Sequence, residues 1–149
     1  MSSQIQRFFH ANGLLRTEVP MLNGRAHGMK RDYYPNGQLA AELPFENGLM
    51  QGTARAWASD GRLLGEYRIE HGTGVVKVWY DNGTLQSEVP VVNGLMSGCQ
   101  KAWYEDGESV PDTYWIRGRR VSRRKYIEAC KTDPELPRYS EAAPTAPRQ

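Results

Sequence analysis

The chain has few of the residues from which active sites are usually built. Its 149 residues include three histidines and two cysteines, and none of the five stands at a metal-ligand spacing. No histidine has a cysteine, serine or carboxylate partner at a recurring spacing, as nucleophilic or acid–base catalysis would require. We therefore expect a protein that is not an enzyme and has no cofactor or metal. The five residues are His10, His27, His71, Cys99 and Cys130.

Long hydrophobic runs are also absent from the sequence. No segment is apolar for long enough to span a membrane, and residues 1–15 lack the apolar run of a signal peptide. The two cysteines stand far apart and form no CxxC motif, which favours a reduced, cytoplasmic protein. Whether Cys99 and Cys130 ever pair as a disulfide stays open at this point.

A net charge of +2 hides an uneven distribution along the chain. Residues 1–116 contain 10 Lys or Arg against 13 Asp or Glu, whereas residues 117–149 contain 9 against 4. A mildly acidic region is therefore followed by a basic segment.

Glycine is frequent, and its spacing organises the chain. Ten of the 15 glycines recur at steps of 11 or 13 residues, and eight of these ten follow Asn or Asp. Asn-Gly and Asp-Gly favour tight hairpins, because both central residues of a type I′ turn need positive φ. The pattern indicates a repeat protein with two turns in each unit. The ten are Gly13, Gly24, Gly37, Gly48, Gly61, Gly72, Gly83, Gly94, Gly107 and Gly118.

Fixed columns surround the first glycine of each unit, which we number position 0. The position 0 glycines are Gly13, Gly37, Gly61, Gly83 and Gly107. Position −6 is a base in every unit: Arg7, Arg31, Arg55, Lys77 and Lys101. Position +5 is an acid in every unit: Glu18, Glu42, Glu66, Glu88 and Asp112. Position −4 is aromatic in every unit: Phe9, Tyr33, Trp57, Trp79 and Trp103. Position −3 is His10, Tyr34, Ala58, Tyr80 or Tyr104, and position +2 is leucine except for Ser109 in the last unit.

Hairpin geometry explains these columns. A two-residue turn places position −6 opposite position +5, so the base and the acid of each unit form a cross-strand ion pair. Each exposed pair contributes only about 0.2–1 kcal/mol, but the set fixes the register, since a one-residue slip would reverse both faces. The same geometry pairs position −3 with the leucine at +2. The aromatic column then packs between repeats or, alternatively, lines a groove for a peptide or for bases.

A proline before the second turn and a later glycine after it recur in three units. Because they face each other across the second hairpin, we expect them to form one bulge. The third unit has neither feature, so a tighter hairpin and a local change of sheet twist are predicted there. The prolines are Pro20, Pro44 and Pro90, and the glycines are Gly28, Gly52 and Gly98.

One complete unit carries a specific resemblance. Residues 33–39 read Tyr-Tyr-Pro-Asn-Gly-Gln-Leu and are followed by Glu42, Asn47-Gly48 and Gly52, and residues 79–98 repeat this pattern. The pattern resembles the MORN-repeat variant found in bacterial proteins of the YwqK family, which are labelled antitoxins. The resemblance covers residues 7–118. It implies a protein-binding module and, more narrowly, an antitoxin or immunity protein that neutralises a cognate toxin by direct binding.

The predicted fold is all-β. We expect an elongated single-layer antiparallel sheet of consecutive hairpins over residues 1–118, capped by a short C-terminal α-helix. Ser122 can N-cap a helix from Arg123 to about Lys131, within a capping segment of residues 119–139. Residues 140–149, rich in proline and alanine, read as a disordered tail.

Two surfaces are candidates for partner binding. Tyrosines at position −3 suit an interface because their hydroxyls tolerate water, and acids outside the paired column would complement the basic active-site cleft of a nuclease or deaminase toxin. These candidates are Tyr34, Tyr80, Tyr104, Glu46, Glu70, Asp81, Glu105, Asp106 and Glu108.

The second surface is a basic patch within residues 117–125. It is either a solvated capping helix or a docking site for an anionic membrane, an acidic protein or, less favoured beside an acidic array, nucleic acid. Bases in the first turn of a helix oppose its dipole, which hints at a negatively charged partner. The patch consists of Arg117, Arg119, Arg120, Arg123, Arg124 and Lys125.

Overall fold

A computed structural model describes residues 2–138 of the chain, which divides into two compact units, residues 1–71 and 72–149. The first unit contains β1 (Ser3–Phe9), β2 (Leu15–Leu22), β3 (Arg25–Ala26), β4 (Gly28–Tyr33), β5 (Leu39–Glu46), β6 (Leu49–Met50), β7 (Gly52–Trp57) and β8 (Leu63–Glu70). The second contains β9 (Thr73–Trp79), β10 (Leu85–Val92), β11 (Leu95–Met96), β12 (Gly98–Trp103), β13 (Ser109–Ile116), β14 (Arg119–Val121) and α1 (Arg123–Cys130). The tail predicted for residues 140–149 lies outside the described residues.

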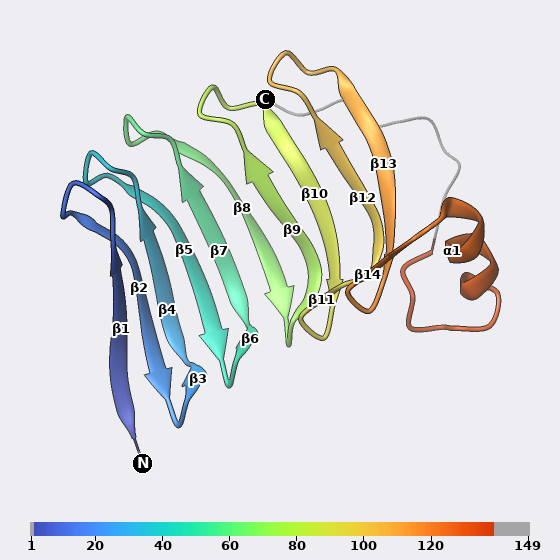
Figure 1. Cartoon of the computed structure of the whole chain (residues 1–149), viewed down its shortest axis with the longest axis horizontal. Coiled ribbons are helices and arrows are strands. Elements are labelled where there is room, and N and C mark those ends of the chain that lie inside the picture. Colours follow the sequence, from blue (N-terminus) through green and yellow to red (C-terminus); the bar gives the residue numbers. More distant parts are fainter. Residues whose placement is uncertain (1, 139–149) are drawn as a thin grey trace. The chain divides into compact units, whose positions relative to one another are not determined.

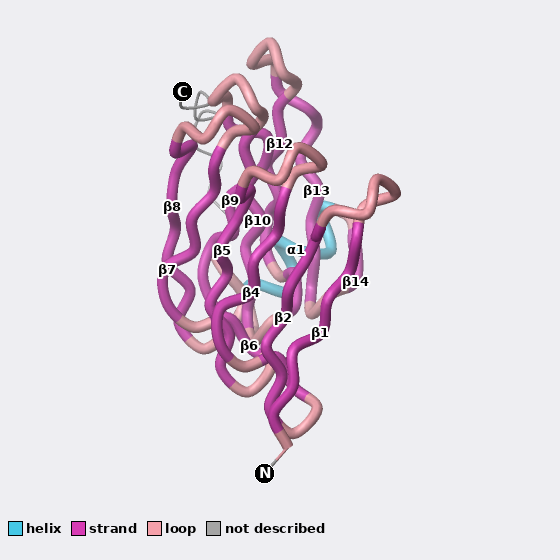
Figure 2. The backbone as a smooth tube through the Cα atoms, turned by 90° about the vertical axis from the view of Figure 1, so that its left-hand side faces the viewer, coloured by secondary structure: helices cyan, strands magenta, loops and turns pink. Residues whose placement is uncertain are grey.

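Both units are antiparallel sheets in which neighbours in the chain are neighbours in the sheet. The first has the order β1-β2-β4-β5-β7-β8, and the second has the order β9-β10-β12-β13-β14 (Figure 1). The two-residue strands β3, β6 and β11 pair with β2, β5 and β10. In each sheet the turns lie at the two ends of the strands (Figure 2). The predicted all-β fold of consecutive hairpins with a short C-terminal helix is confirmed.

The two turns of each unit have different geometries. In the second turns both central residues have positive φ, as at Asn23 (52°) and Gly24 (79°), which is the predicted type I′ pattern. The first turns are wider: the amide of His10 donates to the carbonyl of Leu14 at 2.8 Å, and only Gly13 has positive φ. The two-residue geometry predicted from the sequence is therefore wrong for the first turns.

The wider first turn changes the pairing beside it. Position −4 pairs with position +2, as in Phe9 with Leu15 and Tyr33 with Leu39, and one residue of the second strand is skipped. The predicted pairing of position −3 with the leucine is therefore wrong. Beyond the skipped residue the register returns to the predicted one, so that Arg7 lies opposite Glu18. In the first four hairpins the bulge absorbs the error before the ion pair is reached, whereas in the last hairpin the register shifts between Gln100 and Ala102, beside Lys101.

The predicted bulge of proline and glycine is present in the second hairpins. The amide of His27 donates to the carbonyl of Pro20 at 2.9 Å, and a Cβ added to Gly28 would lie 3.2 Å from Pro20 Cβ. In the third unit, which lacks the proline, β9 runs without interruption from Thr73. The division between the two compact units falls at this same turn, between His71 and Gly72.

The helix α1 begins and ends close to the predicted residues. Ser122 is its N-cap, with the side-chain oxygen accepting a hydrogen bond from the amide of Lys125 at 3.1 Å. The helix packs on β13 through Tyr126, which is fully buried and lies 5.9 Å from Tyr114 between ring centroids. Leu136 completes this small core.

Candidate functional site

A row of alternating charge crosses each sheet on one face. All five predicted ion pairs within hairpins form, and Glu18 also lies opposite Arg31 of the next hairpin, as Glu42 does opposite Arg55 and Glu88 opposite Lys101. The row therefore also joins neighbouring repeats, whereas the sequence predicted ion pairs only within each hairpin. The nitrogen–oxygen distances are 3.2 Å for Arg7–Glu18, 3.0 Å for Arg31–Glu42, 3.1 Å for Arg55–Glu66, 4.0 Å for Lys77–Glu88 and 3.4 Å for Lys101–Asp112.

The candidate tyrosines at position −3 hold adjacent repeats together. The hydroxyl of Tyr34 donates to the carbonyl of Trp57 at 2.7 Å, and the hydroxyl of Tyr80 donates to the carbonyl of Trp103 at 2.8 Å. His10 makes the equivalent contact through Nε2 to the carbonyl of Tyr33 at 2.7 Å. Each contact joins position −3 of one hairpin to position −4 of the next. Whether Tyr34 and Tyr80 also contact a partner stays a prediction.

The asparagine of the first turn serves two purposes. Asn36 Oδ1 accepts from the amide of Gln38 at 2.9 Å, which closes the turn, and Asn36 Nδ2 donates to the carbonyl of Ser59 in the next hairpin at 3.0 Å. Asn12 makes the same two contacts. In the last hairpin, Asp106 Oδ1 accepts from the backbone amide of Glu108 at 2.9 Å, which closes the turn. Because the side chain of aspartate has no NH2 group, it cannot make the second of these contacts.

The last hairpin of the array leaves its position −3 tyrosine exposed. Tyr104 is 55% exposed, and its hydroxyl has no hydrogen-bond acceptor within residues 2–138. Three candidate acids follow it in the same turn and are exposed, Glu105, Asp106 and Glu108. We call Tyr104–Glu108 the terminal loop. It brings together four of the nine predicted partner-binding residues.

A hollow of about 330 Å³ lies at the base of the terminal loop. Trp103 forms part of its wall and is paired with Ser109, where four other hairpins have leucine. The serine lacks the bulk of that leucine, which is consistent with a hollow at this hairpin. The lining residues are Lys101, Ala102, Trp103, Ser109, Val110, Pro111 and Asp112. Sequence reasoning missed the hollow, although Ser109 and Pro111 both depart from the repeat and could have marked it.

The other candidate acids lie away from this loop along the chain. Glu46 is exposed at the end of β5, and Asp81 is exposed in the first turn after β9. Glu70 is exposed at the end of β8, where a hydrogen bond from Gln51 and the guanidinium of Arg68 lower the pKa of its carboxyl. Glu70 therefore remains ionised to lower pH than a free glutamate.

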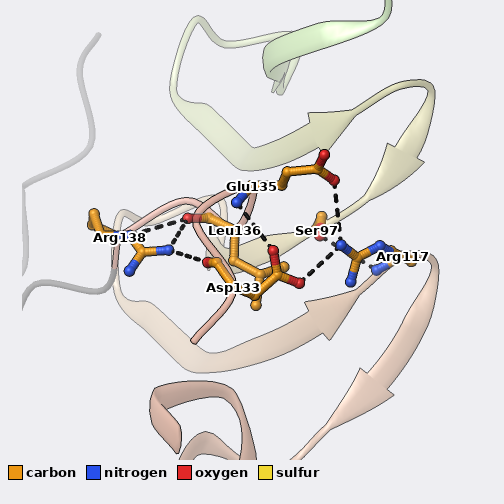
Figure 3. A network of polar contacts seen from close by, with 6 residues as sticks. All are labelled: Ser97, Arg117, Asp133, Glu135, Leu136 and Arg138. Atoms are coloured by element: carbon orange, nitrogen blue, oxygen red, sulfur yellow. Dashed lines mark hydrogen bonds and ion pairs between the residues drawn. The ribbon is translucent and has the colours of Figure 1, made fainter. Parts of the chain in front are cut away.

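The predicted basic patch divides into two parts. Arg117 is held by Asp133 at 2.8 Å and by Glu135 at 3.3 Å, and its amide donates to the hydroxyl of Ser97 (Figure 3). Its hydrogen bond with Arg117 holds the pKa of the Asp133 carboxyl below its usual range. Arg138 binds the carbonyls of Asp133 and Leu136 beside them. This network fixes the segment that follows α1.

The remaining bases of the patch are exposed, and we call them the basic strip. They extend from the end strand β14 into the first turn of α1, which contains no acid. Arg119, Arg120, Arg124 and Lys125 make no ion pair within the described part of the chain. The basic strip comprises Arg119, Arg120, Arg123, Arg124 and Lys125.

The described residues offer little from which a metal site or a reactive thiol could be built. In residues 2–138 no three His, Cys, Asp or Glu side chains gather closely enough to hold a metal ion. Both cysteines are free and half-buried beside the Tyr114–Tyr126 core, and burial raises the pKa of the Cys99 thiol. No helix in the described part of the chain is long and apolar enough to cross a membrane.

Comparison with known proteins identifies the repeat. Two segments match the family described as MORN repeat variant, residues 26–47 in the first unit and residues 73–93 in the second. These segments contain the first hairpins β4–β5 and β9–β10. No curated protein and no solved structure gives a significant match. The two matched segments are therefore similar to the MORN repeat variant, and such repeats indicate a repeat-based binding module.

Proposed function

We propose that the protein binds a protein partner through the terminal loop and the adjoining hollow, and that the partner is a cognate toxin which it neutralises by direct contact. The proposal places the protein in the cytoplasm and gives it no catalytic role. It rests on one observation: the tyrosine column ends at Tyr104, whose hydroxyl has no acceptor within the described residues and whose side chain is 55% exposed. The antitoxin form is motivated by the resemblance of the repeats to those of antitoxin-labelled proteins.

The chemistry of the terminal loop supports a basic partner. Glu105, Asp106 and Glu108 place three exposed carboxylates in the same turn as an exposed tyrosine, and tyrosine is enriched in interfaces. A nuclease or deaminase cleft that binds nucleic acid is basic, so an acidic loop would complement it and speed association. The hollow beside Trp103 can accept a side chain from the partner, since hot-spot residues of interfaces usually fill pockets of the other protein.

The charged columns of the repeats support a scaffold role. The bases at −6 and the acids at +5 are ion-paired with one another in all five hairpins. A feature that recurs in every repeat and is satisfied within the sheet serves stability better than recognition. Recognition is then expected where the repeat is broken, which in the last hairpin means Tyr104, Ser109 and Pro111.

An affinity pull-down from the native cells at moderate salt tests this proposal. The full chain is compared with Glu105→Lys/Glu108→Lys, which reverses two charges and retains Asp106 to close the turn. Glu128→Lys is the matched control, because Glu128 is an exposed acid on α1. We expect one stoichiometric partner with the native chain and the control, and loss of most of it with the double variant. That partner should arrest growth when expressed alone and be harmless when co-expressed with this chain.

Two results would count against the proposal. If the double variant retains the partner in full, the acidic terminal loop is not the interface. If the captured partner has no toxic effect, the protein is a binding module of another kind.

The exposed basic strip favours a second function, docking to an anionic membrane surface. Arg119, Arg120, Arg124 and Lys125 are exposed and make no ion pair within the described part of the chain, whereas Arg117 is occupied by Asp133 and Glu135. A basic segment near an anionic bilayer gains about 1 kcal/mol per Lys or Arg. Co-sedimentation with phosphatidylserine vesicles should then occur with the native chain and disappear when Arg119, Arg120, Arg123 and Arg124 are changed to Ala. Absence of co-sedimentation at physiological salt would exclude this function.

A further inference from the structure

The strand β1 has an exposed edge that contains no proline or lysine and that no other element covers within the described residues. It pairs with β2 on one side, and no other described strand pairs with it. All seven of its residues are exposed, and Ile5, Phe8 and Phe9 are exposed to 48%, 44% and 56%. Natural edge strands are usually blunted by proline, lysine or a covering element, because bare edges pair with other chains.

The sequence of β1 itself favours pairing. Ser-Gln-Ile-Gln-Arg-Phe-Phe contains one charge and neither proline nor glycine, and its β-branched and aromatic residues suit a sheet. The end strand β14 of the second unit differs in each respect. It has three residues, two of which are exposed arginines, and α1 follows directly after it. Within the described residues, β14 is therefore the better protected edge, whereas β1 has a single charge and no covering element.

We propose that β1 is a homodimer interface in which the β1 strands of two copies pair antiparallel about a two-fold axis. A second copy is the occupant because β1 is compatible with pairing to itself. In the register with the fullest overlap, no two like charges of the two β1 strands lie opposite each other. Two-fold interfaces are also the commonest form of self-association. This proposal does not depend on the identity of the partner at the terminal loop.

Strand geometry selects the register. In an antiparallel pair, two opposite residues direct their amide and carbonyl groups either both toward the partner strand or both away from it. Because these groups alternate along a strand, a residue of β1 can face only a residue an even number of positions away in the β1 of the second copy. A centre at Gln6 gives the full overlap of seven residues and places Ile5 opposite Arg7 of the second copy. A centre at Arg7 would place the two arginines opposite each other, which is unfavourable.

Charged substitutions at Gln6 test this register. Gln6 lies on the axis and faces Gln6 of the second copy, so any charge introduced there meets its own kind. Gln6→Glu and Gln6→Lys should each weaken the dimer, whereas an equal mixture of the two variants should form a heterodimer. Both substitutions are at an exposed side chain and leave the β1–β2 pairing of the hairpin in place.

Two substitutions of Ile5 should change the stability of the dimer more strongly and in opposite directions. Ile5→Lys places a second base opposite Arg7 twice by symmetry, and we expect the dissociation constant to rise about two- to thirtyfold from two like-charge contacts. Ile5→Glu places an acid opposite the same Arg7 and should preserve or strengthen the dimer. Leu95→Lys is the matched control, since Leu95 is 49% exposed against 48% for Ile5 and lies in β11.

Sedimentation velocity of the full chain from micromolar to near-millimolar concentration is the experiment. We expect a concentration-dependent monomer–dimer equilibrium and hydrogen-exchange protection of β1 amides that increases with concentration. A monomer at every concentration, or assembly beyond the dimer, overturns the proposal. Equal weakening by Ile5→Lys and Ile5→Glu, or failure of the Gln6 mixture to recover the dimer, overturns it as well.

Discussion

Removing the hydroxyl of a position −3 tyrosine should destabilise the unit that contains it. Tyr34→Phe deletes the donor to the carbonyl of Trp57 at 2.7 Å, and Tyr80→Phe deletes the donor to the carbonyl of Trp103 at 2.8 Å. The phenyl ring remains, so ring packing is conserved while the hydrogen bond to the carbonyl is lost. Tyr104→Phe is the control, because the hydroxyl of Tyr104 has no acceptor in the described part of the chain.

The expected cost follows from the hydrogen bond alone. A neutral intramolecular hydrogen bond contributes about 0.5–1.5 kcal/mol net, and a part-buried carbonyl left without its donor recovers some of this from water. We therefore expect a loss of about 1 kcal/mol for Tyr34→Phe and for Tyr80→Phe, which is about a fivefold change in the folding equilibrium. Tyr104→Phe should change stability by less than about 0.3 kcal/mol.

Urea denaturation followed by intrinsic fluorescence measures these differences. Because Tyr34 and Tyr80 lie in different units, the double variant should lose about the sum of the single losses, as sites without shared partners do. If Tyr34→Phe costs no more than Tyr104→Phe, the hydroxyl is not what joins the repeats. A double variant no less stable than either single variant would refute the same reasoning.

Three further changes have expected outcomes. Gly98→Ala should lower the unfolding temperature more than Gly83→Ala. Both residues have positive φ, at 128° and 94°. An added Cβ at Gly98 would lie 2.6 Å from Pro90 Cγ, whereas none of the described residues comes within 4 Å of a Cβ added at Gly83. Burial raises the pKa of Tyr67 to about 12, so the unfolded state ionises first; stability should fall as pH rises from 10 towards 12, and Tyr67→Phe should remove that part of the loss in urea titrations at pH 9 and pH 11. The hydrogen bond with Arg117 lowers the pKa of Asp133, so its contribution is present above the usual value of 3.8 and is lost as pH falls below it; Asp133→Asn should flatten the acid limb of a fluorescence titration of the α1 core.

The ion-pair columns were the most informative part of the sequence for the fold. Positions −6 and +5 lie far enough from the turn that an error in turn type did not alter their pairing, and Arg31 does face Glu42. The turn itself was mispredicted because the bulge skips position +3. That position is occupied by Arg16, Ala40, Leu64 and Gln86 in the first four hairpins, which share no property that would mark a bulge. Asn-Gly dipeptides occur in both turns, so residue type alone does not separate a type I′ turn from a wider one.

The candidate site was predictable only in part. Tyr34, Tyr80 and Tyr104 stand in the same local sequence context, and the sequence therefore ranked them equally. What separates them is whether a further hairpin supplies a carbonyl, which depends on the next repeat and not on the tyrosine. The base and aromatic columns end at Lys101 and Trp103, which indicates that no further hairpin follows to supply a carbonyl for Tyr104. This can be recognised only by comparing all the repeats, not from the residues around each tyrosine. The hollow beside Trp103 needed the pairing with Ser109, which the assumed two-residue turn had assigned to Tyr104.

A repeat array separates stability from recognition in a way that constrains where function can lie. Recurring polar groups inside the array are satisfied by a neighbouring repeat: Tyr34 by the carbonyl of Trp57, and Glu18 by Arg31 as well as by Arg7 of its own hairpin. A partner that used these groups would have to break contacts that hold the sheet together. The groups available to a partner at no such cost are those at which the repeat ends or departs from its pattern, namely the terminal loop, the basic strip and the outer edge of β1. Substitutions in the columns should therefore lower stability with little effect on binding, and substitutions at these three surfaces should do the reverse.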